Sequence, residues 1–213
     1  MLGHGPAVLW AMFIGGVLWM VNGYFRFMTP QGPDVVWREE LGYSPILSIE
    51  LFLLYNLPGV LALLLTAWAA LSYLFTVPTV RTGLKRTAQV LVLLASLLGL
   101  VAAAGQIVQF DPLTTGGLRL GLPIFGMGLF LAGLIGATDK KSQKGHQRLL
   151  GLELILLGVI GMVTLPVGTI IYALALLPHV FGTAVIALFG VGWIVLGFSL
   201  HNESVENAGT AYA

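Results

Sequence analysis

Long uninterrupted runs of apolar residues dominate this chain, and the polar residues are gathered between them. A helix needs about 20 apolar residues to cross the roughly 30 Å hydrocarbon core of a bilayer, and several runs reach that length. The turn-rich stretch FDPLTTGG separates the third run from the fourth, which then carries no polar side chain. The pattern predicts six membrane-spanning helices, at about residues 6–28, 46–75, 88–108, 120–137, 149–177 and 179–200.

Composition indicates the same class of protein. Of the 213 residues, 57% are hydrophobic and only 9% are charged, whereas a soluble domain carries roughly a quarter charged residues. The alternating pattern of an outer-membrane β-barrel is absent from the sequence, so helices are left to satisfy the backbone in lipid. We therefore expect an all-α fold, a polytopic transmembrane helical bundle. It forms a single domain over residues 1–200, followed by a polar, loosely attached tail over residues 201–213.

The basic residues predict how the bundle is oriented, because Lys and Arg collect in cytoplasmic loops. The loops that follow the second and fourth spans hold most of them, namely Arg81, Lys85, Arg86, Lys140, Lys141, Lys144 and Arg148. The opposite side holds only Arg26, Arg38 and Arg119. We expect a protein integral to the plasma (inner) membrane, with both termini in the cytoplasm.

Two similar stretches, SIELFLL with Glu50 and GLELILL with Glu153, lie about half the chain apart. One interpretation is an inverted repeat of three plus three spans, as many transporters contain. The other is coincidence, since leucine-rich sequence produces such matches easily and the two halves do not align beyond this stretch. Both interpretations remain open at the level of sequence.

Polar residues within the spans gather toward the predicted outer side. The candidate ligand-binding residues are Asn22, Arg26, Glu50, Asn56, Gln106 and Tyr172. Asn22 and Arg26 are four residues apart and share a helix face, and Glu50 enters the next span at a similar depth. A charged group in hydrocarbon is unfavourable unless it is paired or hydrated, so Arg26 and Glu50 are natural partners. The pair either fastens two helices together or forms part of an outward-facing polar pocket.

Several functional classes find no support in the sequence. There is no cysteine, which excludes disulfides and thiolate-held metals, and the net charge of +1 gives no reason to expect nucleic acid binding. The four histidines fall at the ends of spans or in loops, so they do not form the facing pair that a membrane haem requires. We expect no cofactor, no metal and no catalytic residues.

Two hypotheses remain, from different functional classes. The first is a transport or permeation module whose polar pocket takes a small solute, an ion or a lipid headgroup, with the second and fifth spans kinked at Pro58 and Pro166. The second is a non-catalytic accessory subunit of a larger membrane complex. Small residues at four-residue spacing in the third and fourth spans would then contact membrane-protein partners or a second copy. These small residues are Ala95, Gly99, Ala103, Gly128, Ala132 and Gly136.

The orientation can be tested by cysteine labelling, because the chain has no cysteine of its own. A cysteine introduced at Ser142, in a predicted cytoplasmic loop, should react with a membrane-impermeant maleimide only after the membrane is permeabilised. A cysteine at Thr115 should react in intact cells. The reverse pattern would contradict the predicted orientation.

Overall fold

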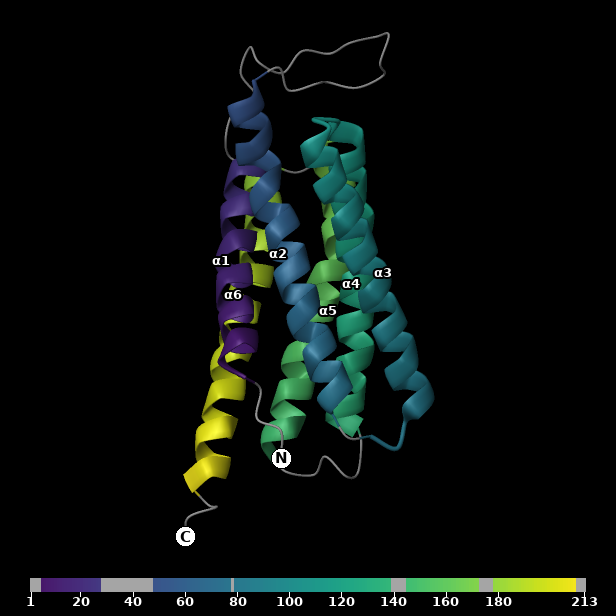
Figure 1. Ribbon diagram of the computed structural model, residues 1–213, viewed down its shortest axis with the longest axis vertical. Helices are drawn as coiled ribbons and strands as arrows, with labels where there is room; N and C mark the ends of the chain where they lie inside the picture. Colours follow the sequence, from purple (N-terminus) through teal and green to yellow (C-terminus); the bar gives the residue numbers. More distant parts are fainter. Residues whose placement is uncertain (1–4, 28–47, 78, 139–144, 173–177, 210–213) are drawn as a thin grey trace.

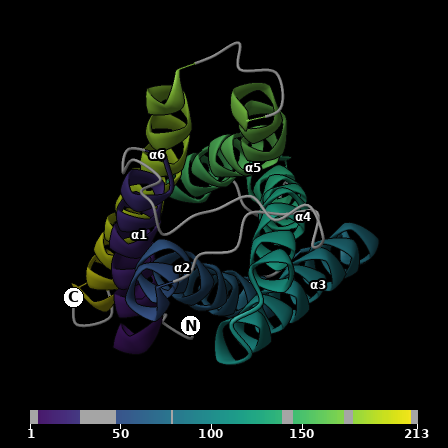
Figure 2. The same ribbon diagram turned by 90° about the horizontal axis from the view of Figure 1, so that it is seen from above.

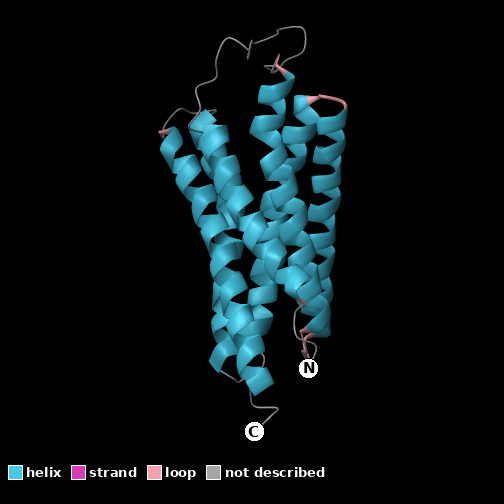
Figure 3. Ribbon diagram, turned by 60° about the vertical axis from the view of Figure 1, so that its left-hand side comes forward, coloured by secondary structure: helices cyan, strands magenta, loops and turns pink. Residues whose placement is uncertain are grey.

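The computed structural model describes residues 5–27, 48–77, 79–138, 145–172 and 178–209. They form six α-helices: α1 (Pro6–Phe27), α2 (Ile49–Thr76), α3 (Thr82–Ile107), α4 (Asp111–Thr138), α5 (Gly145–Tyr172) and α6 (His179–Gly209). Every helix is long and apolar enough to cross a bilayer, and Figure 3 shows them running along one common direction. The prediction of an all-α bundle with six helices of membrane-spanning length is confirmed.

The helices form two groups that lie side by side. The helix α1 packs against α2 and α6, and α4 packs against α3 and α5. Figure 2 shows α1, α2 and α6 on one side of the bundle and α3, α4 and α5 on the other. The two groups meet where α2 contacts α3 and α4, and where α5 contacts α6. The start of α1 and the end of α6 lie at the same end of the bundle, which we call the terminal end (Figure 1).

Glycines let the antiparallel helices α4 and α5 approach backbone to backbone. Gly126 and Gly133 of α4 face Gly158 and Gly151 of α5, and each pair is seven residues apart along its helix. A Cβ atom on Gly158 would lie only 2.5 Å from the backbone nitrogen of Phe130 and 2.7 Å from the carbonyl oxygen of Gly126. No larger residue fits there unless a helix moves.

The same arrangement joins α1 to α6. A Cβ atom on Gly16 would lie 2.6 Å from the carbonyl oxygen of Gly190, and one on Gly23 would lie 3.1 Å from the Cβ of Ile186. The hydroxyl of Thr183 also donates a hydrogen bond to the carbonyl oxygen of Gly23, at 3.1 Å. We call these two contacts, α1 with α6 and α4 with α5, the glycine seams.

The fourth helix begins earlier than predicted, at Asp111 instead of about residue 120. Its first turn holds Asp111 and Pro112, residue types that suit the first turn of a helix. The chain reverses just before it, at Gln109, whose φ of 54° lies in the left-handed region. Gly117 lies inside α4 and does not mark a turn. It allows α4 to pack closely on α3, since a Cβ atom there would lie 2.6 Å from the carbonyl oxygen of Leu98. The prediction that this span lacks polar side chains is therefore wrong.

The last helix also differs from the expectation. The helix α6 continues to Gly209, so residues 201–209, predicted as a loosely attached tail, extend the last span as helix. Pro58 and Pro166 lie inside continuous helices, as does Pro123 of α4.

The two carboxylates of the suggested repeat occupy unlike positions. Glu50 is the second residue of α2, whereas Glu153 is the ninth residue of α5. Glu50 is exposed, whereas Glu153 is half-buried and accepts a hydrogen bond from the Ser199 hydroxyl of α6 at 2.9 Å. Although the stretches SIELFLL and GLELILL match in sequence, their two glutamates therefore lie in different environments.

Most of the small residues proposed as partner-binding faces are buried within the bundle. Ala95 and Ala132 are 0% and 1% exposed, and a Cβ atom on Gly99 would lie 2.9 Å from the Leu64 side chain of α2. A Cβ atom on Gly128 would lie 2.7 Å from Val92 of α3. Partner binding through these faces stays a prediction, and a partner would have to reach the helices from another side.

The glycine seam predicts a position-dependent effect of adding one methyl group. Gly158→Ala should lower the free energy of unfolding by about 1–3 kcal/mol, because α4 and α5 must separate to admit the Cβ atom. Gly116→Ala is the matched control in α4, since no described atom lies within 4 Å of a Cβ built there. Thermal unfolding in detergent measures both. Equal melting temperatures for the two variants would contradict the seam.

Candidate functional site

A cavity of about 270 Å³ lies in the half of the bundle away from the terminal end. This volume corresponds to roughly nine water molecules at about 30 Å³ each, which is small for a ligand pocket. Its walls come from the last halves of α1 and α5 and from the first halves of α2, α4 and α6. The lining residues are Trp19, Asn22, Arg26, Asn56, Thr115, Leu118, Arg119, Leu122, Thr164, Leu165, Gly168 and Ile186.

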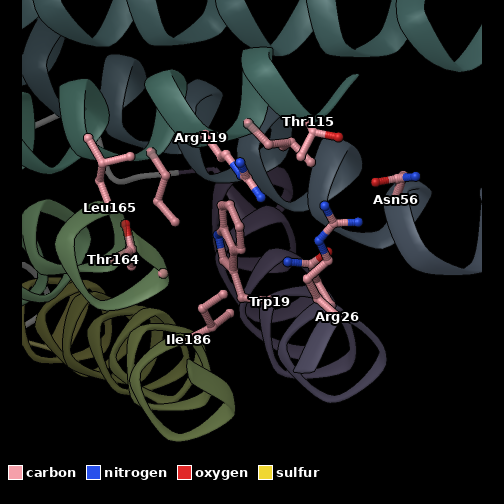
Figure 4. Close-up of a pocket in the computed structure, with 12 residues that line it drawn as sticks. Trp19, Arg26, Asn56, Thr115, Arg119, Thr164, Leu165 and Ile186 are labelled. Carbon is pink, nitrogen blue, oxygen red and sulfur yellow. The ribbon is translucent and has the colours of Figure 1, made fainter. Parts of the chain in front are cut away.

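Two arginines supply the charge of this cavity. Figure 4 shows Arg26 of α1 and Arg119 of α4 extending into it from opposite walls. Arg26 is half-buried and Arg119 is more exposed. Among the described residues, none of those that line the cavity is acidic. A guanidinium is always protonated and carries five N–H donors, so the pair attracts anions and supplies hydrogen bonds to them.

The neutral polar groups are held by hydrogen bonds within the chain. The hydroxyl of Thr115 donates to the carbonyl oxygen of Asp111 at 2.6 Å. The hydroxyl of Thr164 donates to the carbonyl oxygen of Gly161, also at 2.6 Å. While these bonds are kept, each threonine oxygen offers only lone pairs to the cavity.

The Asn56 amide joins α2 to α4 beside the cavity. Its nitrogen donates to the carbonyl oxygen of Phe52 at 3.1 Å and to the carboxylate of Asp111 at 3.4 Å. In Figure 4 the amide oxygen of Asn56 is turned toward Arg26 and the nitrogen is turned away. Since Asn56 is only 1% exposed, this orientation is fixed by the surrounding helices.

Asn22 lies between α1 and α2 and is 5% exposed. Its amide packs over Gly59, where a Cβ atom would lie 2.6 Å from Asn22 Oδ1. That oxygen is buried, and no described atom donates a hydrogen bond to it. Because this oxygen is buried against Gly59, it is not accessible from the cavity.

Aromatic rings close the cavity toward the terminal end. Trp19, which lines the cavity, packs edge-on against Phe189 of α6 at 5.5 Å between ring centroids. Phe125 of α4 stacks on Trp193 of α6 at 5.7 Å with an interplanar angle of 3°. The indole N–H of Trp19 donates to the Thr66 hydroxyl at 3.4 Å. We call Trp19, Phe125, Phe189 and Trp193 the aromatic floor; each ring is at most 1% exposed.

The structure brings together three of the six residues proposed from the sequence. Asn22, Arg26 and Asn56 line one cavity. Gln106 is 8% exposed but is not part of the lining, and neither polar atom of its amide has a partner among the described atoms. The side chain of Tyr172 lies outside the described residues.

Glu50, the remaining proposed residue, is not part of the cavity lining either. It is exposed on the first turn of α2, where its carboxylate accepts a hydrogen bond from the Ser48 hydroxyl at 2.8 Å. The expected ion pair with Arg26 is not formed among the described residues. The physical reason is local: Ser48 is the N-cap of α2 and lies within reach of the Glu50 side chain.

Sequence reasoning missed Arg119, Trp19, Thr115 and Thr164. Arg119 and Thr115 were not predicted because the sequence was interpreted as a loop where α4 begins. A helical reading of this stretch would have found them, since Thr115, Leu118, Arg119 and Leu122 follow the i, i+3, i+4, i+7 spacing of one helix face. Trp19 precedes Asn22 and Arg26 by three and seven residues, on the same face of α1.

Comparison with known proteins gives no further indication of function: no family model, no curated protein and no solved structure matches the chain. Within the described residues, no group of three or more His, Asp or Glu side chains could hold a metal ion. The cavity with its two arginines is therefore the feature from which a function can be argued.

The positions of Arg26 and Glu50 predict independent effects of mutation. Arg26→Leu and Glu50→Leu should change the melting temperature additively in a double-mutant cycle, because Glu50 bonds to Ser48 and Arg26 faces the cavity. Circular dichroism melts of the two single variants and the double variant measure the coupling. If the double variant is more stable than the sum of the two single changes in melting temperature predicts, the two side chains are coupled and the expectation of independent effects is wrong.

Proposed function

We propose that the protein is a membrane transport module whose cavity binds a small anion or the anionic headgroup of an amphiphile. The observation that carries the proposal is the pair of arginines, Arg26 and Arg119, facing one cavity with no acidic residue among the described lining. Guanidinium groups form strong, charge-assisted hydrogen bonds with oxyanions, and each such bond contributes about 1.5–3 kcal/mol.

The surroundings strengthen the attraction between the arginines and an anion. Leu118, Leu122, Leu165 and Ile186 supply apolar walls, so the cavity has a lower effective dielectric constant than bulk water. A charged side chain within a membrane-spanning helix is unfavourable unless water or a counter-charge reaches it. An anion bound between the two arginines would interact with both walls at once.

Movement of the anion across the membrane would require the bundle to open beyond the aromatic floor. Two cavity-lining helices contain a proline close to a lining residue: Pro58 follows Asn56 in α2, and Pro166 lies between Leu165 and Gly168 in α5. Proline removes one backbone hydrogen bond from a helix and permits bending there. Under the orientation predicted from the basic residues, the cavity belongs to the outer side of the plasma membrane.

The proposal predicts anion uptake that depends on the cavity arginines. Proteoliposomes of the full chain should accumulate radiolabelled inorganic phosphate, sulfate or acetate above the level of empty liposomes. Arg26→Gln or Arg119→Gln should reduce that uptake by about tenfold or more, because each removes a charge-assisted donor from the cavity.

Arg86→Gln is the matched control, since Arg86 is exposed on the first turns of α3 and does not line the cavity. Its uptake should equal that of the unmodified protein. Absence of uptake of every anion tested, together with purification of the chain bound to other membrane proteins, would contradict transport and favour the accessory-subunit hypothesis.

A further inference from the structure

We propose that the turn between α2 and α3 binds an anionic phospholipid, with its phosphate group at Arg81 and Arg86 and its acyl chains along the exposed apolar faces of the two helices. Figure 1 shows α2 ending and α3 beginning at the terminal end, whereas the cavity lies in the other half of the bundle. The observation that carries the proposal is that positive charge lies where two exposed apolar helix faces end.

The positive charge of this turn comes from Arg81, Lys85 and Arg86. Arg81 and Arg86 are exposed, and among the described residues neither guanidinium forms a hydrogen bond or an ion pair. The helix α3 contains no acidic residue. The one acidic residue of α2, Glu50, lies in its first turn, at the opposite end of the bundle. Neither of the two helices that the turn joins therefore balances its charge.

Hydrogen bonds hold the start of α3 on the end of α2. The Lys85 ammonium donates to the carbonyl oxygen of Val77 at 2.8 Å and to that of Phe75 at 3.4 Å. The side-chain amide nitrogen of Gln89 donates to the carbonyl oxygen of Leu74 at 3.4 Å. The turn is therefore fixed by the chain itself, and the ammonium group adds a third positive charge beside the two arginines.

Arg86 shares a helix face with the exposed apolar residues of α3. These residues follow Arg86 at helical spacing and are 46% to 61% exposed; they are Val90, Leu93, Leu97 and Leu100. Val90 is the first of them, so Arg86 lies about 6 Å beyond the apolar face along the helix axis. The polar headgroup region of a bilayer begins at about this distance from the hydrocarbon core, which places the guanidinium among phosphate groups.

A similar apolar face of α2 ends at the same turn. Exposed apolar residues recur there every seven positions, or about two helical turns, at Leu54, Leu61, Trp68 and Phe75. Phe75 is 66% exposed and belongs to the last turn of α2. Acyl chains that lie along either face therefore bring their headgroup to the basic turn.

A lipid suits this surface better than a free phosphate ion does. Guanidinium groups form charge-assisted hydrogen bonds with the oxygens of either one. At an exposed site, however, salt screens the attraction for a free ion. A lipid is held at headgroup depth by the membrane, and each Lys or Arg near the surface strengthens the attraction of an anionic lipid by about fivefold.

The experiment is native mass spectrometry of the purified full chain, released from maltoside micelles. Phosphatidylglycerol and phosphatidylcholine with identical acyl chains are added at equal concentration, so that only the headgroup differs. We expect phosphatidylglycerol to bind about tenfold or more tightly, because Arg81 and Arg86 both contribute. Glycerol phosphate at the concentration of the lipid should not displace it, because glycerol phosphate lacks the acyl chains.

Variants locate the site. Arg81→Gln and Arg86→Gln should each weaken phosphatidylglycerol binding by about fivefold and leave phosphatidylcholine binding unchanged. Arg86→Lys should retain most of the preference, since it keeps the charge. Arg148→Gln is the matched control, because Arg148 is an exposed basic residue near the start of α5, also at the terminal end. Its preference should stay within about twofold of that of the unmodified protein.

Several outcomes would overturn the proposal. Equal binding of the two lipids would leave the basic turn to an acidic protein segment. Equal losses in Arg86→Gln and Arg148→Gln would mean that the preference reflects the overall charge of the terminal end. Displacement by glycerol phosphate would exclude a role for the apolar faces. The proposed transport is tested separately, because Arg86→Gln should weaken lipid binding while it leaves anion uptake through the distant cavity unchanged.

Discussion

Direct backbone contact between helices is the interaction on which this structure depends. Within a bilayer the hydrophobic effect does not drive helices together, because lipid tails are as apolar as leucine side chains. Helices must instead gain close van der Waals contact, which requires small residues. The glycine seams provide it at Gly16 against Gly190 and at Gly126 against Gly158. The seams hold each group of helices together, and the cavity lies between the groups where no seam draws them closer.

The seams also give the cavity walls different degrees of support. In α5, Gly151, Gly158 and Gly161 lie against α4, but Gly168 lines the cavity and has no described atom within 4 Å of its Cβ position. The seam with α4 therefore ends before Pro166. In α1, by contrast, Gly23 is still packed against α6 beside the cavity. The wall formed by α1 and α6 is firmly held, whereas the last turns of α5 can move at smaller energetic cost.

The sequence allowed the bundle and three of the twelve residues that line the candidate site to be predicted, for physical reasons that differ between residues. Asn22 and Arg26 were found because helical spacing places them on one face, and Asn56 because a polar side chain at that depth needs a polar neighbour. Arg119 was missed because Gly116 and Gly117 suggest a turn in isolation, and only the packing of Gly117 against α3 makes them helical. The pairing of Glu50 with Arg26 failed because Ser48 is nearer to the carboxylate in the chain.

If the protein transports an anion as proposed, the aromatic floor bears on the kinetic class of that transport. A channel conducts through a continuous hydrated path, and its rate is set by ion movement along that path. Here Trp19, Phe125, Phe189 and Trp193 fill the bundle between the cavity and the terminal end, and at most 1% of each ring is exposed. While these rings stay packed, they lie between the cavity and the terminal end of the bundle. Each turnover would then wait for helices to rearrange, on the microsecond-to-millisecond scale of such motions, so the protein would behave as a saturable carrier.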